Sequence, residues 1–288
     1  VIASALRPLG DLLLPDGSLE LSAGYTGSLD PSGWQMVYAQ DGAPRFLPIS
    51  EAAPEAPLAG GNSWNALGSG VNGYVHDIAI VGRDIYIVGN FWDVSGIAAA
   101  DYIARWDGAA WNAVGAGLND IANEIEWIAG NLYVSGFFTD AGGDLVADGL
   151  ARWDGSQWHA VGNGLNDVET LVTDGVNLYA GGYFTDAGGV TDADYIARWD
   201  GSAWHAVGGG VKYAEHAIAS AGRDIYLGGS LTNAGGIREA DRIARWDGSS
   251  WHALGQGLNF YAQPIAVAGP DIYIGGEFTN AGGNPNAD

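Results

Sequence analysis

Short apolar runs recur throughout the chain, and Gly, Asp or Asn residues bound each of them. Residues 75–81 and 85–89 show the pattern, with a turn at Gly82-Arg83-Asp84 between them. An apolar repeat with the 3.6-residue period of an amphipathic helix does not continue beyond a turn or two. Short apolar runs with turn residues at both ends are typical of strands. The pattern therefore predicts an all-β chain without long helices.

The strand pattern returns with a period of about 47 residues. The segment 103–108, IARWDG, returns at 150–155, 196–201 and 243–248. An aliphatic-Tyr pair, such as Ile85-Tyr86, marks the same period five times. Two series of tryptophans follow it as well: Trp106, Trp153, Trp199 and Trp246 within the segment, and Trp64, Trp111, Trp158, Trp204 and Trp251 around it. Self-similarity at a fixed period of this length indicates a repeat architecture.

Each repeat reads as four short strands. In the first complete repeat they cover residues 75–81, 85–89, 102–106 and 111–115, with a hairpin turn at Asp107-Gly108. A four-stranded antiparallel sheet of this size is one blade of a β-propeller. Since a single sheet cannot cover both its faces, we assign the repeated tryptophans to packing between blades. Glycine pairs such as Gly181-Gly182 predict bulges or close backbone approach.

The repeat resembles that of kelch-type β-propellers. An aliphatic-Tyr strand that ends in Gly-Gly (residues 272–276) and an aromatic-Asp pair followed by a Trp (residues 246–251) carry the resemblance, which covers roughly residues 62–288. The chain is also similar to large bacterial secreted and surface proteins with repeats of the form FTxAGG…IARWDGSxW, and to fungal cortical cell-polarity markers. The resemblance implies the propeller fold and an extracellular or cell-surface location. It says little about function, because such propellers bind many things.

The number of blades depends on how the ring closes. The fifth repeat lacks its third and fourth strands, and residues 36–42 resemble a degenerate third strand. Residues 64–68 fit the fourth strand, with residues 45–49 as a competitor. We therefore expect five blades, the last a composite of both ends of the chain. Part of a six- or seven-bladed ring is the alternative.

Residues 1–33 lie outside the repeat and predict an arm or hairpin, followed by the propeller over residues 34–288 with a loop or linker at 50–61. An arm that pairs with the sheet edge of another copy would produce a homo-oligomer or filament. The alternative is that the arm packs on its own propeller.

Composition narrows the set of partners. The formal net charge is −23, from 34 acidic and 11 basic residues. Such a surface repels nucleic acid and anionic lipid, and it serves solubility or gathers cations. No cysteine is present, which excludes disulfides and thiolate ligands, and no apolar run is long enough to insert into a membrane. The chain begins with Val1, which a cleaved signal peptide would explain.

Few residues of the chain are candidates for ligand binding or catalysis. Residues at one position of the first strand would ring the central channel if that strand is innermost: His76, Glu124, Glu169, His216 and Gln263. Such a ring could hold a divalent cation, or it could be a lining bridged by water. A second column follows the tryptophans and predicts an exposed strand face: Asn65, Asn112, His159, His205 and His252. One arginine per blade, at positions 105, 152, 198 and 245, is expected to brace the repeat.

No catalytic motif stands out, so we expect no enzyme and no cofactor. The copper-radical chemistry of kelch-like oxidases needs a cysteine cross-linked to tyrosine, and the chain has no cysteine. The first functional hypothesis is a structural or adhesive surface module that binds other copies of the protein, with residues 1–33 as the connector. The alternative is a multivalent propeller that binds surface glycans through one exposed aromatic site per blade. Solvent exposure of the repeated rings distinguishes the two hypotheses.

Overall fold

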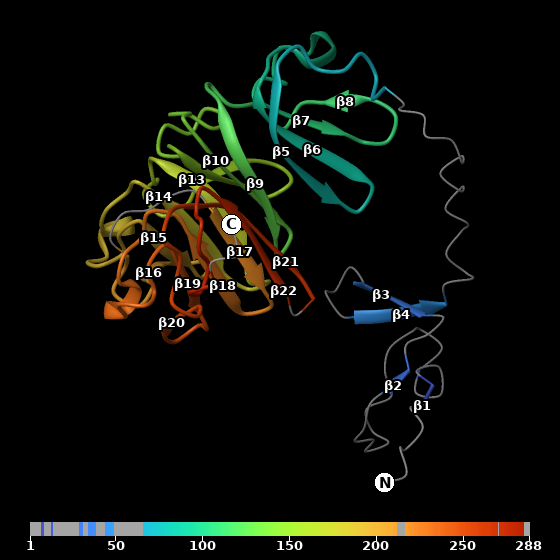
Figure 1. Cartoon of the computed structure of the whole chain (residues 1–288). Coiled ribbons are helices and arrows are strands. Elements are labelled where there is room, and N and C mark those ends of the chain that lie inside the picture. The colour runs from blue at the N-terminus through green and yellow to red at the C-terminus, as the bar shows by residue number, and fades with distance from the viewer. Residues whose placement is uncertain are drawn as a thin grey trace. The chain divides into compact units, whose positions relative to one another are not determined.

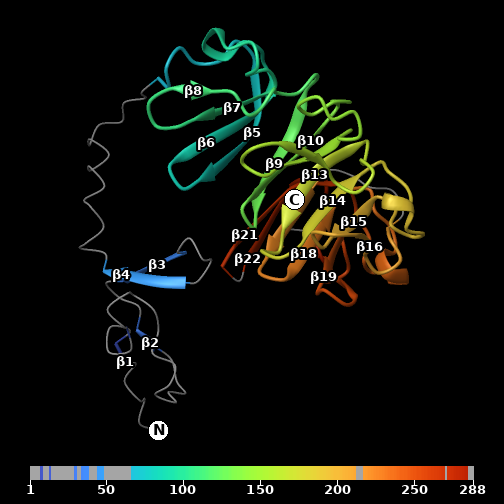
Figure 2. The same cartoon turned by 180° about the vertical axis from the view of Figure 1, so that it is seen from behind.

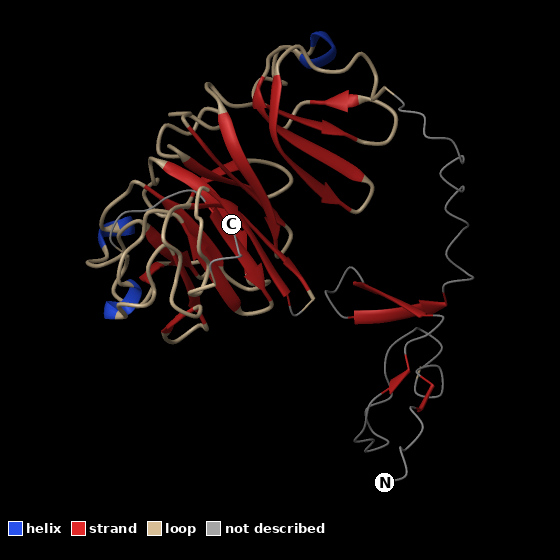
Figure 3. Cartoon of the chain, in the orientation of Figure 1, coloured by secondary structure: helices blue, strands red, loops and turns tan. Residues whose placement is uncertain are grey.

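The computed structural model describes residues 66–211, 217–269 and 271–284, together with Leu13 and four short strands before residue 49. The chain forms two compact units, Val1–Asn65 and Ala66–Asp288. Strands dominate the described residues (Figure 3), and the helical part consists of three 3-10 turns: η3 (Val94–Gly96), η4 (Ala187–Gly189) and η5 (Ala234–Gly236). The prediction of an all-β chain is confirmed.

The first unit contains two small sheets. β1 (Arg7–Pro8) pairs in parallel with β2 (Leu29–Asp30), and β3 (Trp34–Tyr38) pairs antiparallel with β4 (Pro44–Pro48). Residues 36–42, the predicted third strand of the last blade, and residues 45–49, the competitor for its fourth strand, therefore overlap the two strands of one hairpin. The predicted fourth strand at 64–68 is wrong in its described part, because residues 66–68 form no strand. Trp64 lies outside the described residues.

The second unit contains four antiparallel sheets of four strands, followed by a two-stranded sheet. Each four-stranded sheet follows chain order, as the repeat predicts, and Figures 1 and 2 show the sheets succeeding one another.

Blade 1 consists of β5 (Tyr74–Val81), β6 (Asp84–Asn90), β7 (Ile103–Trp106) and β8 (Trp111–Asn112). Blade 2 consists of β9 (Ala122–Ile128), β10 (Asn131–Gly136), β11 (Leu150–Trp153) and β12 (Trp158–Ala160). Blade 3 consists of β13 (Val168–Thr173), β14 (Leu178–Gly182), β15 (Ile196–Trp199) and β16 (Trp204–Ala206). Blade 4 consists of β17 (Ala217–Ala221), β18 (Asp224–Gly228), β19 (Ile243–Trp246) and β20 (Trp251–Ala253), and the partial blade 5 of β21 (Ala262–Ala268) and β22 (Asp271–Gly276).

The first strands of successive blades contact one another, from β5 through β9, β13 and β17 to β21. These strands are therefore the innermost ones, and the arrangement is that of a β-propeller. Among the described residues β22 pairs only with β21, and β3 only with β4. The composite fifth blade and the count of five blades therefore stay predictions.

Tryptophan pairs fill the seams between blades. In each complete blade the two repeat tryptophans face each other across strands three and four, with ring centroids 5.4 Å apart. All of them are buried except Trp106, which is half-buried. The Trp158 Nε1–H donates a hydrogen bond to the Val114 carbonyl of the preceding blade, at 3.1 Å. Gly115 lies beside that carbonyl with φ +61°, and a Cβ there would come within 2.6 Å of the Trp153 ring.

The glycines that end the second strands permit close backbone approach, as expected. A Cβ on Gly182 would collide with the Asp167 carbonyl oxygen, and one on Gly136 with that of Ile121. The register of β13 against β14 shifts between Val168 and Thr170, which places a bulge at the same end of the blade. Close approach here brings the loop after the second strand against the start of the first.

We expect Gly115→Ala to destabilise the propeller more than Gly82→Ala. Both glycines have positive φ, so each substitution costs about 1 kcal/mol for the left-handed backbone. Nothing lies within 4 Å of a Cβ on Gly82, whereas Gly115 would also press on the Trp153 ring, at about 1–3 kcal/mol more. Urea unfolding of the two variants measures the difference. Equal losses would show that the tryptophan seam tolerates a methyl group.

Candidate functional site

The predicted channel residues lie on the innermost strands. His76 is on β5, Glu124 on β9, Glu169 on β13 and Gln263 on β21, while His216 lies outside the described residues. His76 sits at a bulge of β5, and its Nδ1 is 3.0 Å from the Ala122 carbonyl oxygen of blade 2. Glu124 and Glu169 are half-buried, whereas His76 and Gln263 are exposed. The four side chains therefore occupy the expected strands in different environments.

Three carboxyl groups interact at the seam between β5 and β9. The Asp77 Oδ2 accepts a hydrogen bond from the Ile125 backbone N–H at 2.9 Å. Burial, with the charges of Asp77 and Glu126, raises the pKa of Glu124 to about 8. Burial and Asp77 likewise raise the pKa of Glu126 to about 7. No group of three His, Asp or Glu side chains in the described part of the chain is arranged to hold a metal ion.

We expect Glu124→Gln to reduce the loss of stability that accompanies a rise in pH from 5 to 8. Between pH 4.5, the ordinary pKa of a glutamate, and about 8, the unfolded chain releases the Glu124 proton while the folded chain retains it. The unfolded state then binds fewer protons, so the free energy of unfolding falls as the pH rises through this window. Relative to the wild type, Glu124→Gln should gain about 1–2 kcal/mol between pH 5 and pH 8.

Urea unfolding at the two pH values tests this expectation, with Glu239→Gln as the control. Glu239 is an exposed loop residue, and its substitution removes the same charge. If both variants change the pH dependence equally, the effect comes from net charge and not from the buried carboxyl.

The column that follows the tryptophans belongs to the hairpin turns. In blade 2 the His159 Nε2 lies 2.7 Å from Asp154 Oδ2, and Asp154 Oδ1 accepts the backbone N–H groups of Ser156 and Gln157. The hydrogen bond to His159, with those from Gln157 and Ser156, holds the pKa of Asp154 well below its usual range. Equivalent contacts join the turn aspartate to the residue after the tryptophan in three more blades: Asp107–Asn112, Asp200–His205 and Asp247–His252. Asn65 lies outside the described residues. The D-x4-H spacing was present in the sequence as a signal for this pairing.

The arginine column also braces the blades from within. Arg245 Nη1 lies 2.8 Å from Asp224 Oδ2 at the start of the second strand, and Arg105 lies 3.4 Å from Asp84. In blades 2 and 3 an asparagine replaces the aspartate and accepts from Arg152 or Arg198. These arginines therefore connect strands two and three of the same sheet.

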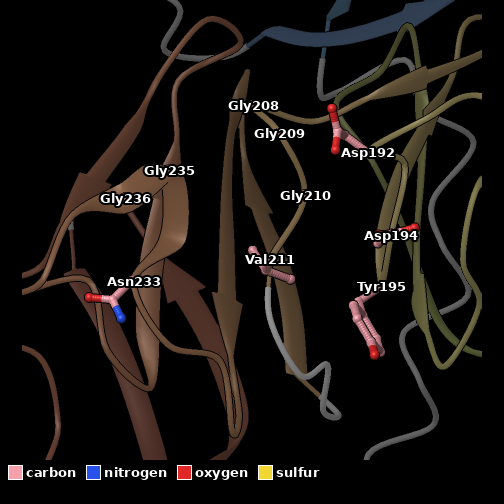
Figure 4. Close-up of a pocket in the computed structure, with 10 residues that line it drawn as sticks. All are labelled: Asp192, Asp194, Tyr195, Gly208, Gly209, Gly210, Val211, Asn233, Gly235 and Gly236. Carbon is pink, nitrogen blue, oxygen red and sulfur yellow. The ribbon is translucent and has the colours of Figure 1, made fainter.

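Three grooves open on the face formed by the loops between strands two and three. We call them the loop grooves. The largest, of about 530 Å³, lies between blades 3 and 4 (Figure 4) and is lined by Asp192, Asp194, Tyr195, Gly208–Val211, Asn233, Gly235 and Gly236. Two grooves of about 480 and 360 Å³ occupy the equivalent place before blades 3 and 1, beside residues 183–189 and 93–96.

The loop between strands two and three adopts one of two conformations, and the loop grooves occur beside only one of them. In blades 1, 3 and 4 the loop makes a 3-10 turn, and an aspartate before the third strand accepts a backbone N–H of the loop: Asp101 from Asp93, Asp194 from Asp186 and Asp241 from Asn233. In blades 2 and 5 the loop instead binds the preceding blade. The Gly142 N–H donates to the Gly117 carbonyl at 3.0 Å, and Gly282 donates to Gly257 at 2.9 Å. The grooves therefore lie at seams where the loop is held within its own blade.

The largest loop groove suits the recognition of polar groups. Glycine backbone forms much of its wall, and in Figure 4 the side chains of Asp192 and Asn233 lie on opposite sides of it. Asp194 is held by the Asp186 N–H, whereas Asp192 is exposed. The charged side chains that line it are acidic, so the groove favours ligands that donate hydrogen bonds or carry positive charge.

The exposed aromatic rings do not follow the tryptophan repeat. Because the repeat tryptophans are buried, a glycan site that stacks on one of them in every blade is ruled out for the described tryptophans. Two exposed rings, Phe137 and Tyr183, share one repeat position after the second strand, and Tyr183 lines a loop groove. Other exposed rings occupy unrelated repeat positions: Tyr74, Trp92, Trp127, Phe260 and Tyr273.

Comparison with known proteins assigns no family to the chain. No family model matches it, and no curated protein sequence matches it. Among solved structures, the crystal structure of the nidogen/laminin complex aligns over 69% of this chain and 71% of its own, with 13% identity and a TM-score of 0.41. The computationally designed Ika8 protein aligns over 75% of this chain and 74% of its own, with 10% identity and a TM-score of 0.37. Both values are too low to carry an argument about function.

No helix in the described segments has the length and apolar character needed to cross a bilayer.

Proposed function

We propose that this chain is a kelch-like structural or adhesive β-propeller module of the cell surface or extracellular space, which binds proteins and does not catalyse a reaction. One observation carries the proposal: the repeated polar side chains are used to brace the scaffold. Turn aspartates bind histidines, and third-strand arginines bind second-strand aspartates or asparagines. Blades 1, 3 and 4 present outward a loop face with a groove that has aspartates in its lining. A surface of that kind supports binding to other proteins.

Self-assembly through residues 1–33 is the form of this function that we favour. The first 65 residues make up a compact unit distinct from the repeats, and their strands pair among themselves. A separate unit of this sort is suited to join one copy to another. The extreme acidity of the chain would keep single copies soluble and make assembly depend on salt.

Electron microscopy and mass measurement of the full chain at several concentrations test the proposal. We expect oligomers or filaments, and Leu13→Asp in the arm should shift them towards single copies, because a charge at an apolar contact opposes burial. Val146→Asp places the same charge on an exposed loop residue of blade 2 and serves as the control. Single copies at every concentration would overturn assembly as the function.

Carbohydrate binding is the second candidate, now restricted to one repeat position. Phe137 and Tyr183 are 59% and 47% exposed, and Tyr183 lies beside a polar groove, where an aromatic ring can stack on a sugar. We expect Tyr183→Ala to abolish binding on a glycan array if this candidate is right. Binding that survives Tyr183→Ala and Phe137→Ala together would contradict it.

A further inference from the structure

We infer that a groove between blades 3 and 4 binds a carboxylate group of another protein, either an acidic side chain or a C-terminal carboxylate. We call it the arginine groove and define it by six of the residues that line it: Asp174, Val176, Asn177, Tyr179, Arg198 and Arg223. Its volume of about 400 Å³ is in the size range of ligand pockets. The choice of a protein as ligand rests on the proposed function, whereas the site itself is separate from the arm.

The arginine groove lies at the opposite end of the blades from the loop grooves. Asp174, Val176 and Asn177 belong to the turn between β13 and β14, and Arg223 belongs to the turn between β17 and β18. In an antiparallel four-stranded sheet, these turns and the loops between strands two and three are at opposite ends of the strands. Blades 3 and 4 both have all four strands, so the groove does not arise from an incomplete sheet.

The guanidinium group of Arg198 is not neutralised within its own blade. In blade 4 the arginine at this repeat position, Arg245, lies 2.8 Å from the carboxylate of Asp224. In blade 3 the residue aligned with that aspartate is Asn177, whose Oδ1 accepts a hydrogen bond from Arg198 Nη1 at 2.8 Å. An amide oxygen satisfies one N–H of the guanidinium group and leaves its positive charge in place.

A second guanidinium group comes from the next blade. Arg223 is exposed, and within the described part of the chain it forms no hydrogen bond or ion pair. Blade 2 has the same brace, Arg152 with Asn131, but Val176 occupies the position of Arg223 in the turn of blade 3 that follows. Among the described blades, only the seam between blades 3 and 4 combines an asparagine-braced arginine with an arginine in the following turn.

The charge of the lining favours a ligand with a single negative charge. Burial raises the pKa of Asp174, but hydrogen bonds from Asn177 and Val176 outweigh it and hold the pKa below its usual value, so the carboxyl group is ionised at neutral pH. Two guanidinium groups and one carboxylate give the lining a net charge of +1. One carboxylate balances that charge, whereas a doubly charged sulfate or phosphate exceeds it. The planar guanidinium group also matches a carboxylate in shape.

The remaining lining suits a peptide better than an acidic sugar. Val176 is 70% exposed and offers an apolar contact beside the two guanidinium groups. Tyr179 is the one aromatic residue of the lining and is 1% exposed, so it presents no ring face on which a sugar could stack. A carboxylate next to an aliphatic side chain fits this combination.

Titration of the full chain with small carboxylates, followed by nuclear magnetic resonance of the arginine Nε–H signals at constant ionic strength, tests the inference. N-acetylvaline carries a C-terminal carboxylate beside an aliphatic side chain, and N-acetylglutamate α-amide carries a side-chain carboxylate. We expect at least one of them to shift the signals of Arg198 and Arg223 saturably. The uncharged N-acetylvaline amide should shift neither signal. The carboxylate that binds more tightly identifies the source of the group.

Arg223→Gln and Arg83→Gln form a matched pair of variants. Both arginines are exposed and follow the glycine of the turn between strands one and two, in blades 4 and 1 respectively. Arg223→Gln should weaken binding about fivefold or more, because it removes one charge-assisted hydrogen bond. Arg83→Gln removes the same charge elsewhere and should leave binding unaltered. Asn177→Asp should also weaken binding, because Arg198 would then face a carboxylate of its own blade, as Arg245 does.

Absence of saturable binding by both carboxylates, or equal losses with Arg223→Gln and Arg83→Gln, would overturn the inference. Tighter binding of sulfate or glucuronate than of either carboxylate probe would assign the groove to a different anion and would also overturn it. Leu13→Asp changes the arm and not the groove. A failure of arm-mediated assembly therefore leaves the titration interpretable, and a failed titration leaves the assembly result intact.

Discussion

The packing of a tryptophan pair against a glycine of the preceding blade is the contact on which the propeller depends. A four-stranded sheet has two faces to cover, and each seam covers one face of each neighbour. At the seam between blades 1 and 2 the glycine lets the backbone come within contact distance of the rings, and the indole N–H donates to the Val114 carbonyl, which also accepts the Gly117 N–H. The same indole bond recurs at Trp111 and Trp251. Sequence variation is then tolerated mainly in the loops.

Because the repeated polar side chains hold the blades together, the repeat offers few groups for binding or catalysis. A histidine whose ring nitrogen is bound to a turn aspartate, or an arginine bound to a strand aspartate, is held in place and is not free to act on a ligand. Function has to come from what differs between blades. One such difference is the conformation of the loops after the second strands, which breaks the symmetry at a surface.

The strands of the complete blades could be predicted from sequence because their signals are local and repeated. Tyr86, Trp106 and Trp111 each mark a strand by residue type, and the Asp-Gly turn joins the last two strands. The pairing of β3 with β4 was one of two alternatives that the sequence left open, since residues 64–68 and 45–49 both fit the strand after residues 36–42 and only long-range packing decides between them. Periodicity likewise indicated the channel strands but not the environments of His76 and Glu124, which depend on the contact with the next blade.

The conformation of the loops after the second strands could not be predicted from sequence, for a related reason. Residues 137–142 read FFTDAG and residues 183–188 read YFTDAG, yet the first loop bonds to the preceding blade and the second makes a 3-10 turn. The choice rests on whether a glycine N–H finds a carbonyl across the seam, which is a property of two blades and not of one segment. A repeat protein can therefore carry nearly identical sequences in two states. The surface of each blade is therefore specified in part by the neighbouring blade.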